Sequence, residues 1–519
     1  MGNPIVPYLH MTIMSKALVA LCLALVVGEC GGCHRRNDDY WRLIAQAQHS
    51  VDHGKYQEAV TTLSRAIAEC PDESLLPLAY FRRGQVYLQQ NLLDEAIKDC
   101  DTAIERLPSW SDVYCLRGAA YEKKGHGDQA IRDYSQAIAL DGGNPNPYLR
   151  RASLLAAKGC FEDARKDLVI ALHLDPACDL AYFHRGKVCA ATGELRSAIQ
   201  DFSRAIELNP NEAAYYVHRG HVYARRGQFS DDMRDYDSAI RDYTTYIRMY
   251  PNASLGYLKR GLALLAMDRD EDALTDFKKV LRIEPDSRDA YFGRGLIYHA
   301  RGKYDSATEE YDRAIAIGPD SDSLREWRGM AFEALGSHKK ALADFSEARR
   351  LSPGRSYPRF LLGWTRYNMG EFQKAYEDLS AATELMAREK RPTTDPYAHF
   401  YLMLSARRAA ILEPRDFQGV PVKQIDEKRR DWIEKLQGFF AGHLTEEGLI
   451  QAAQDVRDAQ TRQRRLCEAC FYAGTFRILD GDVREGERLL HRSVATEAFQ
   501  VLERTSAIQE LKRTQRDVP

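Results

Sequence analysis

The sequence predicts an all-α protein in which antiparallel helix pairs repeat along the chain as a solenoid. Three observations support this prediction. Glycine recurs at a fixed interval of 34 residues, alanine recurs with the same period further along each repeat, and proline closes most of the repeats. A fixed period of this length indicates stacked supersecondary units, because each unit buries its apolar face only against its neighbours.

Residues 1–33 have the features of an export leader. The apolar segment 17–28 follows Lys16 and is shorter than the roughly 20 residues that span a bilayer, but its length is typical of a secretory signal. Translation starts at one of three methionines, namely Met1, Met11 or Met14. The glycines before Cys33 resemble the flank of the lipidated cysteine in bacterial lipoproteins. Three fates of the leader are open: lipidation of Cys33, ordinary signal cleavage nearby, or retention as an uncleaved anchor. In each case we expect the rest of the chain outside the cytoplasm.

Ten repeated units cover residues 40–389, and two positions in each unit carry small residues. Helix A of a unit carries Gly84, Gly118, Gly186, Gly220, Gly261, Gly295, Gly329 or Gly363, with Ala152 in the one gap. Helix B carries Ala59, Ala96, Ala130, Ala164, Ala198, Ala239, Ala273, Ala307, Ala341 or Ala375. We expect these residues where the two helix backbones come closest, because a larger side chain there would be overpacked.

Each unit is predicted to break twice, which divides it into two helices. The break in the middle is Gly125, Gly159, Gly193, Gly227, Gly302, Gly336 or Gly370, at a left-handed cap position that favours glycine. The break at the end is a proline, which cannot continue a helix. Each unit therefore consists of two antiparallel helices, A and B.

The period and the residue classes resemble the tetratricopeptide repeat (TPR) family. The resemblance covers about residues 40–389 and implies a right-handed superhelix of antiparallel helix pairs. It also implies that helices A line a concave groove in which peptides or partner proteins bind. Residues 390–519 are predicted to form a C-terminal helical region that ends in a degenerate TPR-like unit over 467–490.

One unit, near residues 213–253, has 41 residues because the heptad Arg-Asp-Tyr-x-x-x-Ile occurs twice, at 234–240 and 241–247. Seven residues make almost two helical turns. We therefore expect a longer helix B whose buried stripe still faces inward. The extension is either a knob that docks a partner or a duplication that the solenoid tolerates.

Charged residues also recur with the period of the repeat. Arginine precedes the glycine of helix A at Arg83, Arg117, Arg151, Arg185, Arg219, Arg260, Arg294 and Arg328. An acid follows sixteen residues later at Asp99, Asp133, Asp167, Asp201, Asp276, Glu310 and Asp344, with Asp242 as the counterpart in the long unit. The matching acids favour ion pairs between helices over an arginine array that binds an anionic ligand.

The groove positions implied by the TPR resemblance are mostly apolar. We name the following candidates the groove row: Phe81, Leu149, Phe183, Lys187, Val217, His221, Leu258, Leu262, Phe292, Leu296 and Trp364. A surface as apolar as this would be an exposed hydrophobic patch unless another segment or a partner covers it. An apolar or helical peptide and the chain's own C-terminal region are the two candidate occupants. The Lys and Asn pattern with which some TPR domains clamp a chaperone's terminal carboxylate is absent.

The C-terminal region resembles a family of bacterial TPR lipoproteins, the NlpI-like envelope adaptors. The matching residues are Trp432, Phe440, Gly442, Leu444, Phe471, Tyr472, Gly474, Gly481 and Asp482. Together with the leader, this resemblance implies an adaptor on the periplasmic side of the bacterial cell envelope. Such adaptors bring a protease to murein hydrolases, but this chain has many more repeats and need not share those partners.

Composition and motifs argue against several other functions. The chain has 73 Lys and Arg against 75 Asp and Glu, and no basic tract indicates nucleic-acid binding. No phosphate-binding loop, nucleophile elbow, zinc motif or dinucleotide turn occurs, so we expect neither a catalytic residue, a metal nor a cofactor. The Cys467-x-x-Cys470 pair lacks the context of a redox or metal motif.

The sequence therefore predicts a non-enzymatic, exported and membrane-anchored scaffold that binds proteins through its groove. Two alternatives are an enzyme whose site is hidden in residues 390–519 and a structural or oligomerisation module.

Overall fold

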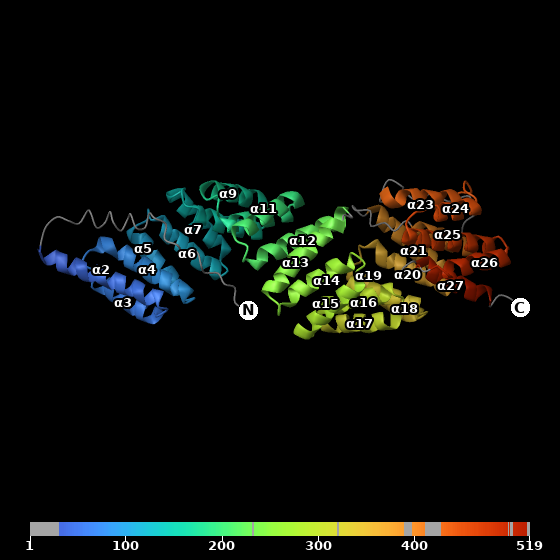
Figure 1. Cartoon of the computed structure of the whole chain (residues 1–519), viewed down its shortest axis with the longest axis horizontal. Coiled ribbons are helices and arrows are strands. Elements are labelled where there is room, and N and C mark those ends of the chain that lie inside the picture. Colours follow the sequence, from blue (N-terminus) through green and yellow to red (C-terminus); the bar gives the residue numbers. More distant parts are fainter. Residues whose placement is uncertain are drawn as a thin grey trace. The chain divides into compact units, whose positions relative to one another are not determined.

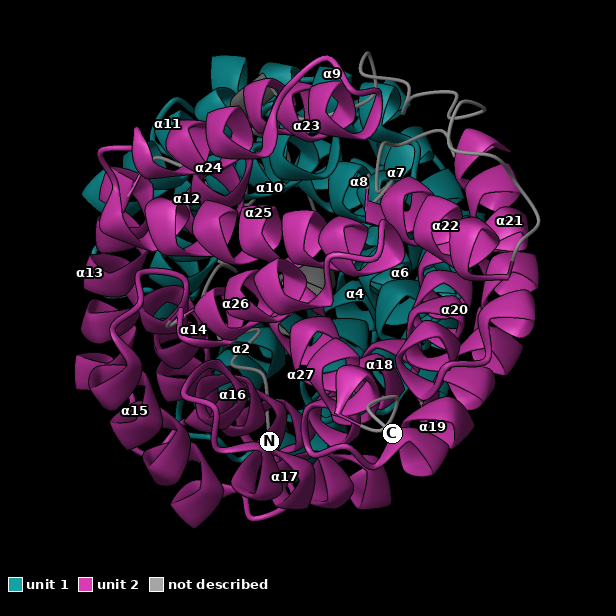
Figure 2. Cartoon of the chain, turned by 90° about the vertical axis from the view of Figure 1, so that its right-hand side faces the viewer, with its two compact units in different colours: residues 1–222 teal, residues 223–519 magenta. Residues whose placement is uncertain are grey.

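The computed structural model describes residues 31–230, 233–318, 321–388, 397–409, 427–496, 498 and 502–515, with side chains beginning at 37 and, in the helix that starts at 427, at 430. These residues form α-helices and one 3₁₀ turn and contain no strand (Figure 1). The all-α prediction is therefore confirmed. The chain divides into two compact units, residues 1–222 and 223–519 (Figure 2).

The helices of unit 1 follow one another as helix pairs. They are α2 (Gly31–Asp52), α3 (Tyr56–Ala68), α4 (Leu76–Gln89), α5 (Leu93–Arg106), α6 (Ser111–Lys123), α7 (Gly127–Leu140), α8 (Pro145–Ala157), α9 (Phe161–Leu174), α10 (Asp179–Ala191) and α11 (Leu195–Leu208). The boundary between the units falls within α12 (Ala213–Ser230).

The helices of unit 2 continue the same order. They are α13 (Met233–Met249), α14 (Ser254–Leu265), α15 (Asp270–Ile283), α16 (Arg288–Ala300), α17 (Tyr304–Ile317), α18 (Asp322–Ala334), α19 (His338–Leu351), α20 (Ser356–Met369), α21 (Phe372–Arg388), α22 (Tyr397–Arg408), α23 (Glu427–Phe440), α24 (Glu446–Gln454), α25 (Ala459–Leu479), α26 (Val483–Val494) and α27 (Leu502–Thr514).

Even-numbered helices from α2 to α20 are the A helices, and odd-numbered helices from α3 to α21 are the B helices. Within each unit, successive helices pack against one another, as α4, α5 and α6 do. A helices also contact the next A helix, for example α8 with α10 and α16 with α18. Stacked hairpins of this kind bury each apolar face against a neighbour.

In six hairpins the glycine of helix A meets an aromatic or leucine side chain of helix B, sixteen residues later. A Cβ on Gly118 would lie 2.9 Å from the Tyr134 ring, and one on Gly295 would lie 2.4 Å from the Tyr311 ring. The ten alanines predicted on the B helices are all fully buried. The predicted close approach of the helices is therefore present, because any larger side chain would overlap its neighbour.

Next to this contact, the arginine of helix A pairs with the acid of helix B, as the sequence predicts. Arg151 donates from Nε and Nη2 to the two carboxylate oxygens of Asp167, at 2.8 and 2.7 Å. The same two-pronged arrangement recurs in Arg83–Asp99, Arg117–Asp133, Arg185–Asp201, Arg260–Asp276 and Arg328–Asp344. We call each of these ion pairs, together with the small residue of helix A beside its arginine and the side chain that packs on that residue, a rung.

The third arginine nitrogen joins neighbouring hairpins, which the sequence analysis did not predict. Arg151 Nη1 donates to Ser135 Oγ of the preceding B helix at 2.9 Å. Equivalent bonds reach Ser64, Asp101, Ser203, Thr244 and Asp312. The signal was present, because a hydroxyl or acid follows the rung acid by two residues in most units. Each such arginine therefore fixes both its own hairpin and the stacking of that hairpin on the previous one.

The turn between helices A and B uses a left-handed residue at nearly every repeat. Six of the seven predicted glycines have positive φ, from +69° at Gly302 to +86° at Gly193. Asn91 and Asp268 occupy the same turn position with φ of 62° and 55°. Gly227 is the exception and corrects the prediction, since it lies inside α12 and its backbone is helical.

The long hairpin explains why Gly227 does not end its helix. Arg226–Gly227 on α12 repeats Arg219–Gly220 seven residues later. Arg226 Nε donates to Asp235 Oδ2 at 2.7 Å, and a Cβ on Gly227 would lie 2.9 Å from the Tyr236 ring. The extension therefore adds one complete rung. Helix A as well as helix B is lengthened, which corrects the expectation that only helix B grows.

The C-terminal region resumes the pattern after α22. The degenerate unit predicted over 467–490 corresponds to α25 and α26, where a Cβ on Gly474 would lie 2.9 Å from the carbonyl oxygen of Gly486. Helix α24 begins after Thr445, whose side chain caps its first turn, and ends at Gln454. Helix α27, which no repeat signature predicts, packs against α20, α25 and α26.

The rungs generate a prediction about stability. The side chain of Asp167 is 6% exposed and that of Arg151 is 21% exposed. Replacing Arg151 by Met leaves a nearly buried carboxylate without its partner, so we expect the free energy of unfolding to fall by about 1–3 kcal/mol. The double variant Arg151→Met, Asp167→Leu removes the orphaned charge and should lose less. Urea unfolding followed by circular dichroism measures both effects.

The exposed pair Arg204–Glu207 provides the matched control, since its side chains are 49% and 64% exposed. Arg204→Met should leave the urea midpoint nearly unchanged. A double variant less stable than the single Arg151→Met variant would show that the rung does not act through charge burial.

Candidate protein-binding site

Helix α27 covers the groove row at α20, the last A helix of the ten repeats. Trp364 Nε1 donates to Ser506 Oγ at 2.9 Å, and the Trp364 side chain is 1% exposed. The Tyr367 hydroxyl donates to Glu510 Oε1 at 2.7 Å. Ser506 Oγ in turn donates to Asn368 Oδ1 at 2.8 Å. The chain's own C-terminal region is therefore the occupant at this end.

The contact between α27 and its neighbours is polar as well as buried. Glu503 and Glu510 are almost fully buried, and each accepts a tyrosine hydroxyl. Arg408 also donates to Glu510 at 2.6 Å. Burial and the charge of Glu510 raise the pKa of Tyr367 well above its ordinary value, which keeps the hydroxyl protonated as a donor. These bonds fix the register of α27, because a shifted helix would leave buried carboxylates unpaired.

Two members of the groove row are consequently not accessible. Trp364 lies beneath α27, so its assignment to an open groove is corrected. Phe81 is 8% exposed because Trp110 packs against it, with ring centroids 4.7 Å apart. In both cases the covering side chain lies outside the unit that the repeat pattern describes, so the pattern could not reveal it.

In unit 1, the remaining groove-row residues gather on α8, α10 and α12. Leu149, Phe183 and Val217 are partly buried, whereas Lys187 and His221 are exposed. The Phe183 ring packs against Tyr215 and His218, with centroids 4.9 and 5.0 Å apart. The structure thus places these predicted residues on consecutive A helices with aromatic and basic groups together.

In unit 2, Leu258, Leu262, Phe292 and Leu296 are partly buried on α14 and α16. The two leucines of α14 pack against the core that contains Phe277. Helices α14 and α16 contact each other directly, so the four side chains belong to adjacent elements. The set carries no charge, unlike its counterpart in unit 1.

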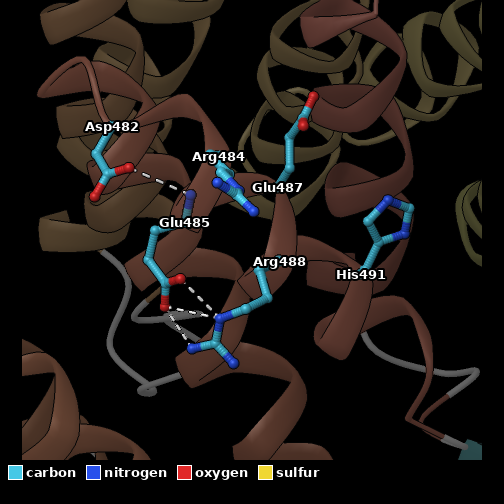
Figure 3. A pocket seen from close by; sticks show the side chains of 6 residues that line it. All are labelled: Asp482, Arg484, Glu485, Glu487, Arg488 and His491. Atoms are coloured by element: carbon cyan, nitrogen blue, oxygen red, sulfur yellow. Dashed lines mark hydrogen bonds and ion pairs between the residues drawn. The ribbon is translucent and has the colours of Figure 1, made fainter.

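The alternative of an enzyme would place its site in residues 390–519. One surface depression in this region is lined by Asp482 and by five residues of α26 (Figure 3). Glu485 accepts hydrogen bonds from Arg488 there, at 2.9 Å from Nε to Oε1. The acidic and basic side chains of the depression thus pair with each other on the surface of one helix, and they do not form an arrangement typical of a catalytic site.

The two cysteines of the Cys467-x-x-Cys470 pair are packed in the interior of the C-terminal region. Both thiols are buried and unbonded to each other, and burial raises their pKa values to about 12 and 11. Cys467 Sγ lies 3.3 Å from Ser493 Oγ on α26. Across the described part of the chain, no three His, Cys, Asp or Glu side chains come together in a way that could hold a metal.

The leader and its candidate lipidation site lie largely outside the described residues. Cys33 belongs to the first turn of α2, but its side chain is not described. Among the helices described, none combines the length and the apolarity needed to cross a bilayer.

The geometry defines a class of protein first, namely a solenoid of stacked helical hairpins that presents a row of apolar and basic side chains. Models of the tetratricopeptide repeat match residues 231–283, 258–322 and 186–227, and a model of the tetratricopeptide repeat-like domain matches residues 40–151. The chain is therefore a tetratricopeptide repeat protein. A comparison with curated protein sequences finds no match.

Solved structures with similar folds include other TPR proteins. MamA is 29% identical over 34% of this chain and 92% of its own, with a TM-score of 0.31. YrrB, described as a TPR protein with an unusual peptide-binding site, is 23% identical over 40% of this chain and 97% of its own, with a TM-score of 0.32. PilF of Pseudomonas aeruginosa is 19% identical over 41% and 95%, with a TM-score of 0.37. The resemblance to NlpI-like lipoproteins stays a prediction.

The covering helix generates a prediction about local stability. Ser506 is fully buried and bonded to Trp364, Asn368 and Tyr401. Ser506→Asp introduces a carboxylate that the site cannot solvate. We expect faster amide hydrogen exchange in α27 and α20 in this variant, measured by mass spectrometry.

Lys512→Asp is the control, because Lys512 is exposed on the same helix. It should leave exchange in both helices unchanged. Equal protection of α27 in the Ser506→Asp variant and the wild type would contradict the role given to these buried hydrogen bonds.

Proposed function

We propose that this protein is a non-enzymatic scaffold that binds protein or peptide partners through the groove row. The observation that carries the proposal is the set of partly exposed apolar side chains on consecutive A helices, at α8 and α10 in unit 1 and at α14 and α16 in unit 2. TPR folds generally serve as protein interaction modules. A partner that covered Phe183 or Leu258 would remove apolar surface from water, at about 25 cal/mol per Å².

We also propose that the scaffold works on the periplasmic side of the bacterial cell envelope, held to the membrane by a lipid on Cys33 or by an uncleaved leader. The support is the sequence alone: the apolar segment 17–28 and the glycines before Cys33. The structural role at the C-terminal end has its own support, since α27 fills the surface of α20. That end of the chain acts as a cap, whereas α8, α10, α14 and α16 carry the binding function.

Crosslinking and pull-down from envelope extracts test partner binding. Phe183→Asp and Leu258→Asp, combined in one variant, place a charge in each unit's part of the groove row. We expect this variant to recover at least tenfold less of any partner than the wild type does, because burying an unpaired carboxylate opposes binding.

The matched control is Val169→Asp with Ile317→Asp, since both side chains are exposed apolar residues of B helices. This control should recover as much partner as the wild type. Equal recovery by the groove-row variant would show that partners bind elsewhere.

Metabolic labelling with a lipid precursor tests the anchor. We expect the wild type to incorporate label and Cys33→Ala to lose it, because the thiol is the acceptor of the lipid. Cys70→Ala is the control, since Cys70 lies in the folded part of the chain as a free thiol. Incorporation that persists in Cys33→Ala would place the modification elsewhere.

A further inference from the structure

A group of six residues on three consecutive A helices of unit 1 combines one aromatic ring with five basic side chains. We call it the Phe183 patch: Arg150 on α8, Phe183, His184 and Lys187 on α10, and His218 and His221 on α12. The Phe183 ring lies at its centre. Lys187 Nζ is 5.6 Å from the ring centroid, and the rings of His184 and His218 are 5.6 and 5.0 Å away.

The basic groups of the patch act on one another. Burial, followed by the positive charges of Lys187, Arg150 and His218, lowers the pKa of His184 to about 4. Burial and repulsion from Lys187 and His221 together lower the pKa of His218 to about 4. All the charges that perturb these two histidines are cationic. The patch is therefore a place where a negative charge would be stabilised.

Two acidic side chains on α6 and α10 already have partners of their own. Glu122 of α6 lies 3.6 Å from Arg150 and accepts a hydrogen bond from the Tyr134 hydroxyl. Asp179, the buried acid of α10, accepts bonds from the Tyr215 hydroxyl and from Asn209. Within the described residues, no acidic side chain is paired with Lys187. This contrasts with the rungs, where every basic group has its own carboxylate.

We propose that the Phe183 patch binds an acidic peptide segment, with an apolar side chain of the segment on the Phe183 ring and side-chain carboxylates beside Lys187, His218 and His221. The proposal rests on the proposed function and names the chemistry of the partner. Packed helices are 8–10 Å apart, so the basic groups on α8, α10 and α12 span too great a width for one carboxylate. A segment that carries several acidic side chains fits this spread better than a single chain terminus does.

The apolar part of the site comes from the neighbours of Phe183. Leu149 on α8 and Val217 on α12 occupy the equivalent repeat positions on either side, and both are partly buried. A leucine or phenylalanine of the partner would contact this strip while its acidic neighbours reach the basic side chains. The combination favours alternating acidic and apolar residues over a wholly charged segment.

Fluorescence anisotropy with three labelled, end-blocked peptides of twelve residues tests the proposal. The first alternates glutamate with leucine, the second replaces every glutamate by glutamine, and the third replaces every leucine by glycine. We expect the first to bind the full-length chain at least tenfold more tightly than either of the others. Raising the salt from 50 to 500 mM should weaken its binding, because the exposed charges are screened.

Lys187→Glu with His221→Glu should weaken binding of the first peptide at least tenfold. Lys98→Glu with His173→Glu is the matched control, since it exchanges the same residue types at exposed positions of B helices. The control should bind like the wild type. Circular dichroism of both variants verifies that they are folded.

Binding should also depend on pH. A bound carboxylate raises the pKa of His184 and His218, so the complex takes up protons and gains affinity as pH falls toward the raised values. We expect the first peptide to bind at least threefold more tightly at pH 5.5 than at pH 7.5, and the dependence should weaken in His184→Gln with His218→Gln.

Two outcomes would overturn the inference in different ways. If the glutamine peptide binds as tightly as the glutamate peptide, and Phe183→Asp still abolishes binding, the groove row binds peptides but does not select acidic ones. If none of the peptides binds while the pull-down recovers a partner that depends on Leu258 alone, the function stands and the Phe183 patch is not its site.

Discussion

The rung between helices A and B is the constraint on which the rest of the structure depends. In most ordinary units, an arginine and a glycine on helix A face an acid and a ring on helix B, sixteen residues later. The glycine sets how close the helices come, because the ring fills the space that a side chain would occupy. The arginine sets their register through two parallel hydrogen bonds and reaches back to the preceding B helix. The rung thus fixes both the packing within a hairpin and the stacking of that hairpin on the preceding one.

The long hairpin shows that the element that recurs along this chain is the rung rather than a fixed length of 34 residues. Seven added residues would leave half a rung without a partner if they lengthened one helix only. They are divided between α12 and α13, so that Arg226 meets Asp235 and Gly227 meets Tyr236. The glycine that would have ended α12 becomes a packing residue instead. Whether a glycine ends helix A or packs inside it therefore depends on the side chain of helix B that it faces.

The same kinds of side chain have different consequences according to what pairs with them. Basic groups in the rungs are neutralised by acids and contribute to folding. Around Phe183, Lys187 lies over the aromatic ring, and burial with repulsion from neighbouring cations keeps His184 and His218 uncharged at neutral pH. At the C-terminal end, carboxylates such as Glu510 are satisfied by Tyr367 and Arg408, which closes that end of the row. The groove-row residue of α20 is thus covered by α27, whereas Lys187 on α10 remains exposed.

The sequence by itself determined the helix pairs, the small residues at their crossings and the partners of the rungs, because each of these depends on residues within one 34-residue period. It also placed Phe183, Lys187 and Leu258 on the A helices. Only the tertiary structure decided which of those residues stay accessible. Trp364 is covered by α27, about 140 residues later in the chain, and Phe81 by Trp110 of the next unit. The first contact joins the repeats to a segment outside them, and the second uses a tryptophan that no other repeat has at its position, so the repeat pattern records neither contact.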